Sequence, residues 1–453
     1  MAILDTLGQN LITELQRIQA PDALPEKDKG DFEMPGWIAT GDGRSIVLSS
    51  EMERLITAIA DELRKASPSL AQSHTVKEWT WLIRGMFGPA LVTIDLDDDC
   101  AKNATKVIAS VQAQLVTTPA TSDCEHGFGC TLFGNMDVAP FEIGPVRFEP
   151  REAWLNRKET AGDVSATTAR RLRKWWAGGK LAKRKQGVEA MRERDVQGAM
   201  ADCPFVCSVS TTGLAAEAGR LKAQIAAHMA MAAISLRWEV PSSALSGFRL
   251  LIDPPVRRQL SLVFKPGVKT LAGRHLVGMP HGPTISAQEW LSQFTAHEDV
   301  FAVMGEAITY YLTATGVSSR PKMMSVLAQA LLWFHEACRE EVDLMAVVKF
   351  TATLDALAGG GKSGGIKRVV NARLSIKDQD LIRKDGPTLK AAIDEIYSDG
   401  RSRTIHGTND KLGHDWSSSR RLAEAFARLC LIMCADWMAK NPLSDDPTAL
   451  QSP

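Results

Sequence analysis

The stretch "EDVFAVMGEAITYYLTATG", residues Glu298–Gly316, decides the fold, because strand signals end where it begins. Its apolar residues recur every three or four positions and would form one stripe along a helix: Phe301, Met304, Ile308 and Leu312. Four further amphipathic segments follow: "PKMMSVLAQALLWFHEACREE" (321–341), "LMAVVKFTATLDALAGGG" (344–361), "GPTLKAAIDEIYSDGRSRTIHG" (386–407) and "SSSRRLAEAFARLCLIMCADWMAKNP" (417–442). Five such helices predict an all-α bundle over residues 296–445.

The segments before this bundle mix helix and strand signals. "GLAAEAGRLKAQIAAHMAMAAISLRW" (213–238) predicts a long alanine-rich helix, with His228 as a packed core residue. "CTLFGNMDVAPFEIGPVRFEP" (130–150) predicts a sheet with hairpins, and "PALVTIDLDDD" (89–99) predicts a strand that runs into an acidic turn. We therefore expect an α+β protein in which residues 1–295 form a mixed region, divisible into two subdomains, that senses a signal or positions a substrate.

Composition limits the possible function classes. The 453 residues carry a formal net charge of +0, so any contact with nucleic acid must come from a local basic patch. The eight cysteines are scattered, and the sequence shows no signal peptide and no apolar run of the roughly 18 residues that a bilayer span needs. These features predict a cytoplasmic protein with free thiols and no membrane partner.

The densest positive segment is "TARRLRKWWAGGKLAKRKQGVEAMRERD" (168–195). One interpretation is a single-strand RNA surface, in which tryptophans stack on bases and cations bind phosphates. Its predicted backbone contacts are Arg170, Arg171, Lys183 and Arg184. The other interpretation is a solvated helical hairpin whose Trp175 and Trp176 pack inward.

Two further patterns resemble known sites only in part. "GGGKS" (359–363) ends like a phosphate-binding P-loop, but it follows a predicted helix instead of a strand, so a glycine turn between helices fits better. A zinc site could be assembled from residues whose spacing matches no standard finger or ribbon: Cys124, His126, Cys130, Cys203 and Cys207.

The stretch "DEIYSDGRSRTIHGTND" (394–410) places two phosphate-handling side chains at a helix end. Arg401 is a fixed cation, and His406 can carry a proton near neutral pH. Gly407 is a natural left-handed helix stop. Five residues correspond to about 140° on an ideal helix, so the two side chains do not share a face. One phosphate could touch both only at a distorted helix end or with a second copy of the motif.

"IYSDGRSRTIHG" (396–407) resembles the signature of the ApeA-like branch of HEPN domains, in which a tyrosine-containing helix leads into Arg-Ser-x-x-x-His-Gly. The matching positions are Tyr397, Arg401, Ser402, His406 and Gly407. "TLDALAGGGKSGGIKRVVNARLSI" also resembles the upstream family segment, where Asp355 stands at the position that usually holds glutamate. The resemblance covers residues 296–441 and is loose before them.

This resemblance implies an endoribonuclease that needs no metal or other cofactor and leaves 2′,3′-cyclic phosphate ends. His406 would be the general acid or base, and Arg401 would stabilise charge on the phosphoryl oxygens. Ser402 and Arg403 would hold neighbouring phosphates, and Asp355 would orient the histidine or pair with Arg401. For Asp355 and Arg403 an ordinary surface ion pair is an equal alternative.

The same resemblance implies a role in bacterial anti-phage defence, with the nuclease restrained until a phage-derived or nucleic-acid trigger arrives. Independently of the resemblance, the offset of about 140° between Arg401 and His406 predicts a homodimer whose cleft takes residues from both copies, and the fourth and fifth bundle helices would share an apolar face through Leu422, Phe426 and Leu429. A different class remains open, in which the HEPN fold serves as a non-catalytic dimerisation or RNA-binding module.

Overall fold

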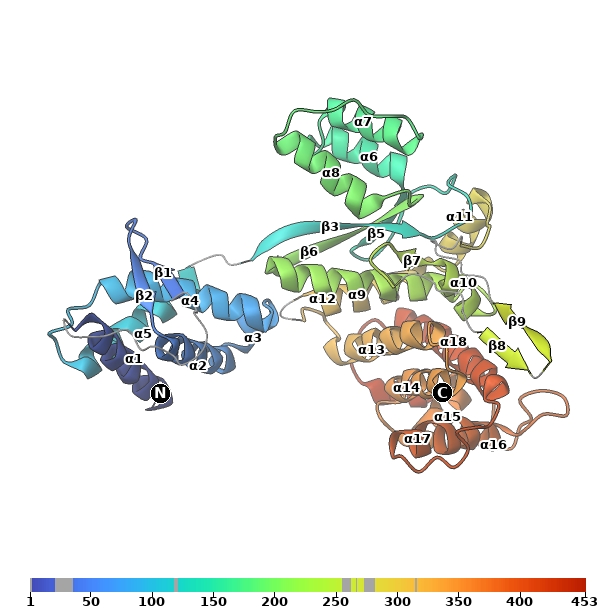
Figure 1. Ribbon diagram of the computed structural model, residues 1–453. Helices are drawn as coiled ribbons and strands as arrows, with labels where there is room; N and C mark the ends of the chain where they lie inside the picture. The colour runs from blue at the N-terminus through green and yellow to red at the C-terminus, as the bar shows by residue number, and fades with distance from the viewer. Residues whose placement is uncertain are drawn as a thin grey trace. The chain divides into compact units, whose positions relative to one another are not determined.

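The computed structural model of this chain describes residues 2–20, 36–117, 121–254, 262–265, 267–272, 282–313 and 316–453 (Figure 1). The chain forms two compact units. The first contains Met1–Cys124, Thr212–Leu221 and Thr313–Thr315, and the second contains Glu125–Thr211, Lys222–Leu312 and Gly316–Pro453. The predicted α+β class is confirmed, because both units combine helices with antiparallel strands.

The first unit packs helices and one hairpin around its own apolar core. Its elements are α1 (Ala2–Gln19), β1 (Gly36–Ala39), β2 (Ser45–Leu48), α2 (Ser50–Ala66), α3 (Pro68–Gln72), α4 (Val76–Val92) and α5 (Cys100–Thr117). The strand predicted at 89–99 is wrong, because α4 continues to Val92 and a turn follows. A capping box between Thr75 and Glu78 starts α4.

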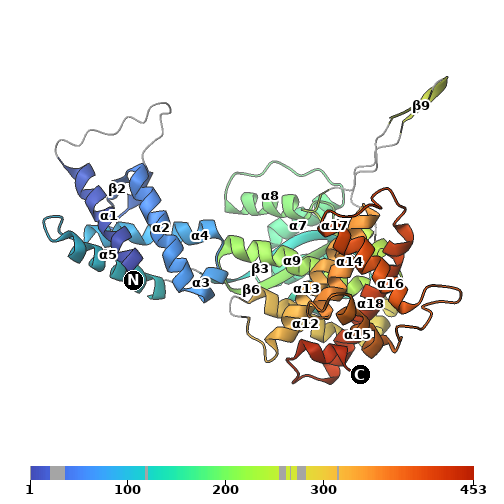
Figure 2. The ribbon, with the colours of Figure 1, turned by 90° about the horizontal axis from the view of Figure 1, so that it is seen from below.

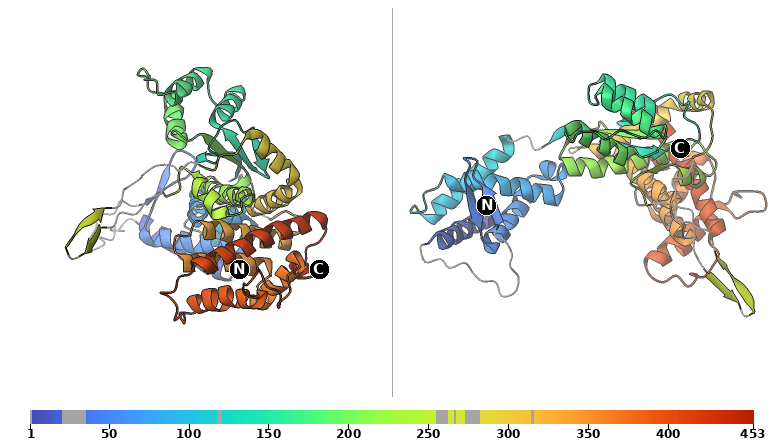
Figure 3. Two further views of the ribbon diagram at one scale, coloured as in Figure 1. Left: turned by 90° about the vertical axis from the view of Figure 1, so that its right-hand side faces the viewer. Right: turned by 45° about the horizontal axis from the view of Figure 1, so that its top comes forward.

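The second unit contains a five-stranded sheet with strand order β4-β5-β6-β3-β7. The strands are β3 (Ser122–Thr131), β4 (Phe141–Ile143), β5 (Val146–Pro150), β6 (Phe205–Leu214) and β7 (Arg249–Leu250), and a separate hairpin pairs β8 (Leu262–Lys265) with β9 (Val268–Ala272). Around the sheet lie α6 (Arg151–Thr160), α7 (Ala166–Trp176), α8 (Val188–Met200), α9 (Ala216–Ser235) and α10 (Pro241–Gly247). Figures 1 and 3 show α6–α8 on one side of the sheet and α9 on the other.

The C-terminal helices follow from residue 287 and pack side by side, as α13, α14 and α18 do in Figure 2. They are α11 (Ala287–Ala296), α12 (Glu298–Leu312), α13 (Pro321–Cys338), α14 (Asp343–Leu357), α15 (Lys362–Leu374), α16 (Leu389–Asp394), the π-helix η1 (Glu395–Ser402), α17 (Arg403–Ile405), α18 (Ser417–Lys440) and the 3₁₀ helix η2 (Pro447–Gln451). All five predicted helical segments are found. The sequence missed α15, because its glycine-rich start reads as a turn.

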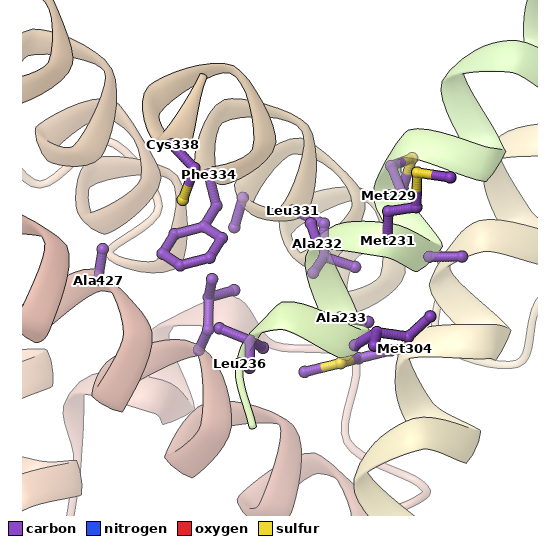
Figure 4. Close-up of a cluster of buried hydrophobic side chains, with 14 of the residues drawn as sticks. Met229, Met231, Ala232, Ala233, Leu236, Met304, Leu331, Phe334, Cys338 and Ala427 are labelled. Carbon is purple, nitrogen blue, oxygen red and sulfur yellow. The ribbon is translucent and has the colours of Figure 1, made fainter. Parts of the chain in front are cut away.

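One continuous apolar core joins the sheet, α9 and the C-terminal helices. Figure 4 shows the contact, where Met231 of α9 and Leu236, which follows that helix, lie among Met304 of α12 and Leu331 and Phe334 of α13. The predicted domain boundary at 295/296 therefore falls inside the second unit. The second unit begins at Glu125, and two later segments, Thr212–Leu221 and Thr313–Thr315, belong to the first unit.

Two other expectations concern thiols and membranes. All eight cysteines are free, as predicted. Among the described residues, no single helix has the length and apolar composition to cross a bilayer. Only α14 and α15 taken together pass that test, and a bend of 70° separates them.

His228 is a core residue, as predicted, but it belongs to a buried charged cluster. Its Nε2 lies 2.8 Å from Oδ1 of Asp253, whose Oδ2 accepts a hydrogen bond of 2.8 Å from Arg339. The ring of His335 stacks on His228 with centroids 4.4 Å apart, and its Nδ1 lies 3.2 Å from Oε1 of Glu336. This cluster ties α9 to α13 and to the turn after β7.

Two members of the cluster, His335 and Asp253, should make the free energy of unfolding decrease as the pH is lowered. Burial lowers the pKa of His335 to about 4. The hydrogen bond to Glu336 opposes this effect, and the charges of His228 and Arg339 add to it. Between pH 6.5 and 4 the unfolded chain therefore binds the extra proton, which costs about 3 kcal/mol of stability over that window. Burial raises the pKa of Asp253, but His228 and Arg339 outweigh it and lower the value, so its contribution is lost only in stronger acid.

We therefore expect the melting temperature to fall steadily from pH 6.5 to pH 4, measured by circular dichroism. His335→Gln removes the titrating group and should flatten the slope in this window, whereas the exposed His414→Gln should leave it as in the wild type. Equal slopes for all three proteins would show that His335 is not responsible.

Candidate functional site

The predicted motif lies on a helix that changes its geometry partway along. Thr388 caps α16, which continues as the π-helix η1 and then as the short α17. Gly400 lets η1 approach α14 closely, because an added Cβ would lie 2.7 Å from Cγ1 of Val347. Thr351 of α14 also donates a hydrogen bond of 3.2 Å to the carbonyl of Ile396. A π-helical turn inside a helix is rare and often marks a functional site.

Arg401 is held on the side of η1 that faces α14. Its Nη2 lies 3.0 Å from Oδ2 of Asp355, and the two side chains are 25% and 14% exposed. Its Nη1 donates a hydrogen bond of 3.3 Å to the hydroxyl of Tyr397, and its guanidinium carbon lies 5.3 Å from the centroid of that ring. Two roles were predicted for Asp355, orienting the histidine or pairing with Arg401. The structure shows the pairing with Arg401.

This arrangement leaves hydrogen-bonding capacity unused. Arg401 has five N–H groups, and the two contacts occupy one on each terminal nitrogen. Its Nε and Oδ1 of Asp355 are buried without a hydrogen-bond partner within the described part of the chain. Because unsatisfied buried polar atoms are costly, these atoms mark a place where a polar ligand or water would be stabilised.

His406 stands at the end of this helix, as predicted. Gly407 has a φ of +69°, the N–H of Thr408 bonds to the carbonyl of Arg403, and the N–H of Gly407 bonds to the carbonyl of Thr404. These two bonds form a Schellman motif, which fixes the helix end. The His406 side chain is exposed, and no hydrogen bond or ion pair holds it among the described residues.

The remaining motif residues lie in different environments. Arg403 is an exposed residue that pairs with Asp410 at 3.1 Å and with Asp399 at 3.6 Å, so it matches the predicted surface ion pair. The carbonyl of Ser402 accepts the backbone N–H of His406 at 3.0 Å. Arg401 faces α14 while His406 faces solvent, and the structure does not join the two side chains through a hydrogen bond.

Sequence reasoning missed two features of this site. Lys411 forms an ion pair of 2.7 Å with Asp399 and, with Asn409, ties the following loop back to η1. Trp416 is buried under this loop and donates its Nε1 hydrogen to the Lys411 carbonyl. The lone tryptophan of "TNDKLGHDW" (408–416) is the signal in the sequence that could have indicated a buried anchor.

The basic segment forms the helical hairpin α7–α8, and acidic residues neutralise part of it. Arg171 and Arg184 pair with the same carboxylate, Glu193, at 2.7 and 2.8 Å. Arg170 and Lys183 remain exposed. RNA binding by this segment stays a prediction, with two of its four residues engaged in ion pairs inside the hairpin.

The tryptophans of this hairpin are half-buried. Trp176 donates its Nε1 hydrogen to the carbonyl of Ala201 at 2.8 Å, and the guanidinium of Arg151 lies 5.2 Å from its ring centroid. Trp176 therefore anchors the hairpin, in agreement with the inward packing that the second interpretation described.

The P-loop-like pattern and the Cys/His set lack the surroundings that a nucleotide site or a zinc site would need. "GGGKS" connects α14 to α15, so a helix and not a strand precedes it. Of the proposed zinc ligands Cys130, Cys203 and Cys207 are buried, and burial raises the pKa of Cys203 to about 11. In the described ranges, no three His, Cys, Asp or Glu side chains are grouped so that they could hold a metal ion.

Comparison with known proteins adds no further evidence about this site. No family model matches the chain, and neither a curated protein nor a solved structure matches it. The case for a function therefore rests on the geometry around Arg401 and His406.

Proposed function

We propose that this chain is a HEPN endoribonuclease of the ApeA-like type, with Arg401 and His406 as its catalytic residues. The observation that carries the proposal is the guanidinium of Arg401, fixed by Asp355 and Tyr397 at the start of the turn whose other end presents the exposed His406. A fixed guanidinium with free N–H groups suits an anionic phosphoryl group. An exposed imidazole suits proton transfer near neutral pH.

In the proposed reaction the RNA supplies its own nucleophile. The 2′-hydroxyl loses its proton to a base, its oxygen bonds to the adjacent phosphorus, and the bond from phosphorus to the 5′-oxygen breaks. The leaving 5′-oxygen takes up a proton, so the products are a 2′,3′-cyclic phosphate and a 5′-hydroxyl. His406 carries the proton in one of these transfers, while Arg401 stabilises the charge on the phosphoryl oxygens.

The proposal includes a homodimer, because Arg401 faces α14 whereas His406 faces solvent. The apolar face predicted for dimerisation needs a correction: Phe426 is only 5% exposed and belongs to the core, and Leu422 packs against that core. Leu429 and Met433 are 39% and 37% exposed, and they lie four residues apart on α18. Side chains at this spacing are neighbours on a helix surface, so these two provide the apolar contact in the proposed dimer.

The biological part of the proposal follows from the same resemblance. The enzyme would act on RNA in the bacterial cytoplasm during anti-phage defence and stay restrained until a phage-derived or nucleic-acid trigger arrives. Residues 1–295 would sense that trigger or position the substrate.

A non-catalytic dimerisation or RNA-binding module is the second candidate. The observation that favours it is that Arg401 already has two partners, Asp355 and Tyr397, and does not contact His406. In this case the motif would bind RNA without cleaving it.

The proposed mechanism predicts cleavage that persists in EDTA. A 5′-labelled single-stranded RNA is incubated with the full chain, with and without chelator, and the products are separated by electrophoresis. We expect equal rates, 5′-hydroxyl ends that accept label from a kinase without prior phosphatase treatment, and cyclic phosphate at the other end. Loss of cleavage in EDTA that magnesium restores would indicate a metal-dependent nuclease instead. Binding without cleavage in the presence of the trigger would favour the second candidate.

A further inference from the structure

Two arginines away from the motif are brought together, because Arg428 donates a hydrogen bond to the carbonyl of Leu236, the residue before Arg237. Arg237 follows α9, and Arg428 lies on α18. Within the described part of the chain neither forms an ion pair, and the charge interaction of Arg237 is with Arg428 itself. Glu239 is the carboxylate whose charge acts on Arg428, and it is exposed.

The side chain of Arg237 is unusually poor in partners. Its Nε–H is buried and donates no hydrogen bond among the described residues, and its guanidinium carbon lies 5.9 Å from the ring centroid of Phe301. Arg428 uses its Nε to donate a hydrogen bond of 3.0 Å to the carbonyl of Leu236, which leaves its terminal nitrogens available. Figure 4 shows the two neighbours of this pair, Leu236 and Ala427, at the apolar core.

A third basic group lies close to the pair. His297 forms the C-cap of α11, and the charge of Arg237 acts on it. Burial, and then Arg428, lower the pKa of Arg237 to about 10. Burial, and then Arg237, also lower the pKa of His297. The surroundings thus disfavour positive charge at the position where the fold places two arginines.

Arginine is rarely buried unless it is paired, because desolvating a charge without a counterion is costly. We infer that Arg237 and Arg428 form a binding site for a phosphate-type oxyanion, which supplies the missing negative charge. Planar guanidinium groups bind phosphate oxygens in a bidentate manner, and the free N–H groups of both side chains are sufficient for one such group. This site combines Arg237, which follows α9, with Arg428 of α18, and it does not depend on the proposed ribonuclease activity.

The test measures binding of inorganic phosphate to the full chain by isothermal titration calorimetry at constant ionic strength. We expect one saturable site per chain in the wild type and an affinity at least about tenfold lower in Arg237→Met and in Arg428→Met, since each variant loses a charge-assisted contact. Arg421→Met removes an exposed arginine from the same helix and should bind like the wild type.

Thermal unfolding provides a second measurement that does not depend on heat signals. Phosphate stabilises most proteins through its exclusion from their surface, so the response of the variants is the relevant comparison. The melting temperature should rise more with phosphate in the wild type and in Arg421→Met than in the two site variants. In phosphate-free buffer Arg237→Met should melt no lower than the wild type, because it removes an uncompensated charge.

Two competitors identify the source of the phosphate group. A nucleoside 5′-monophosphate offers a terminal phosphate, whereas a single-stranded DNA with unphosphorylated ends offers only diesters. Displacement of inorganic phosphate by the first alone indicates a terminal phosphate, and displacement by both indicates a nucleic-acid backbone. His406→Ala should bind phosphate like the wild type, which separates this site from the proposed ribonuclease centre. Equal phosphate binding by the wild type, Arg237→Met and Arg428→Met would overturn the inference.

Discussion

Replacement of His406 by alanine is expected to lower the rate of RNA cleavage by about 10²–10⁴-fold, the usual contribution of a general acid or base. Folding stability should not change by more than about 0.5 kcal/mol, because His406 is exposed and its side chain has no partner among the residues that the structure describes. Single-turnover cleavage of a labelled RNA and thermal unfolding of the same preparations measure the two quantities. Loss of activity without loss of stability would assign the histidine to chemistry.

His414→Ala is the matched control for this experiment. His414 is also exposed and lies in the loop after the motif, where its ring meets Trp416 edge-on at 5.5 Å. The His414→Ala variant should cleave RNA at the wild-type rate. A slower rate in this variant would show that removing any imidazole near the motif impairs cleavage. If His406→Ala cleaved as fast as His414→Ala with the protein in its activated state, the catalytic proposal would be wrong.

The C-terminal helices could be predicted because each has an apolar stripe and recognisable ends. Pro321 begins α13, where proline is favoured, and Gly407 takes the left-handed conformation that ends the helix of the motif. These signals are local, since they depend on residues within one or two turns. The same local signals are weak in "GGGKSGG", and α15 was missed there.

Other features depend on contacts between distant segments. The residues 89–92 are apolar and β-branched in part, and only their packing within the core of the first unit makes them the end of a helix. The predicted boundary at 295/296 followed a change in composition, but the core does not change there. Composition along a chain cannot reveal that α9 shares its buried face with helices almost a hundred residues later.

The sequence was sufficient to predict which residues belong to the candidate site, but not how they are arranged in space. Arg401, His406 and Gly407 could be found from spacing, and Asp355 from the resemblance. The π-helical turn of η1 could not, because it depends on how closely Gly400 lets that helix approach α14. In the basic segment, the positive residues were evident, but their neutralisation by Glu193 depends on how α7 and α8 pair.

The isolated bundle, residues 296–445, is expected not to fold. The fragment lacks α9 and the residue that follows it, and four of their side chains are buried in the shared core: Met229, Met231, Ile234 and Leu236. Burying each such side chain is worth about 1.5–3 kcal/mol, so their loss costs about 6–12 kcal/mol. This is comparable with the whole stability of a domain, about 5–15 kcal/mol.

The matched fragment is 121–453, which keeps the sheet, α9 and the bundle. It should show one cooperative thermal transition by circular dichroism, whereas 296–445 should show none and should bind a dye for exposed apolar surface. Within the longer fragment Phe334→Ala, at the contact shown in Figure 4, should cost about 3–5 kcal/mol and lower that single transition without splitting it. A cooperative transition in 296–445 would instead show that the bundle is an independent domain, as its sequence alone had suggested. Such a result would mean that α9 only covers a core which the C-terminal helices complete by themselves.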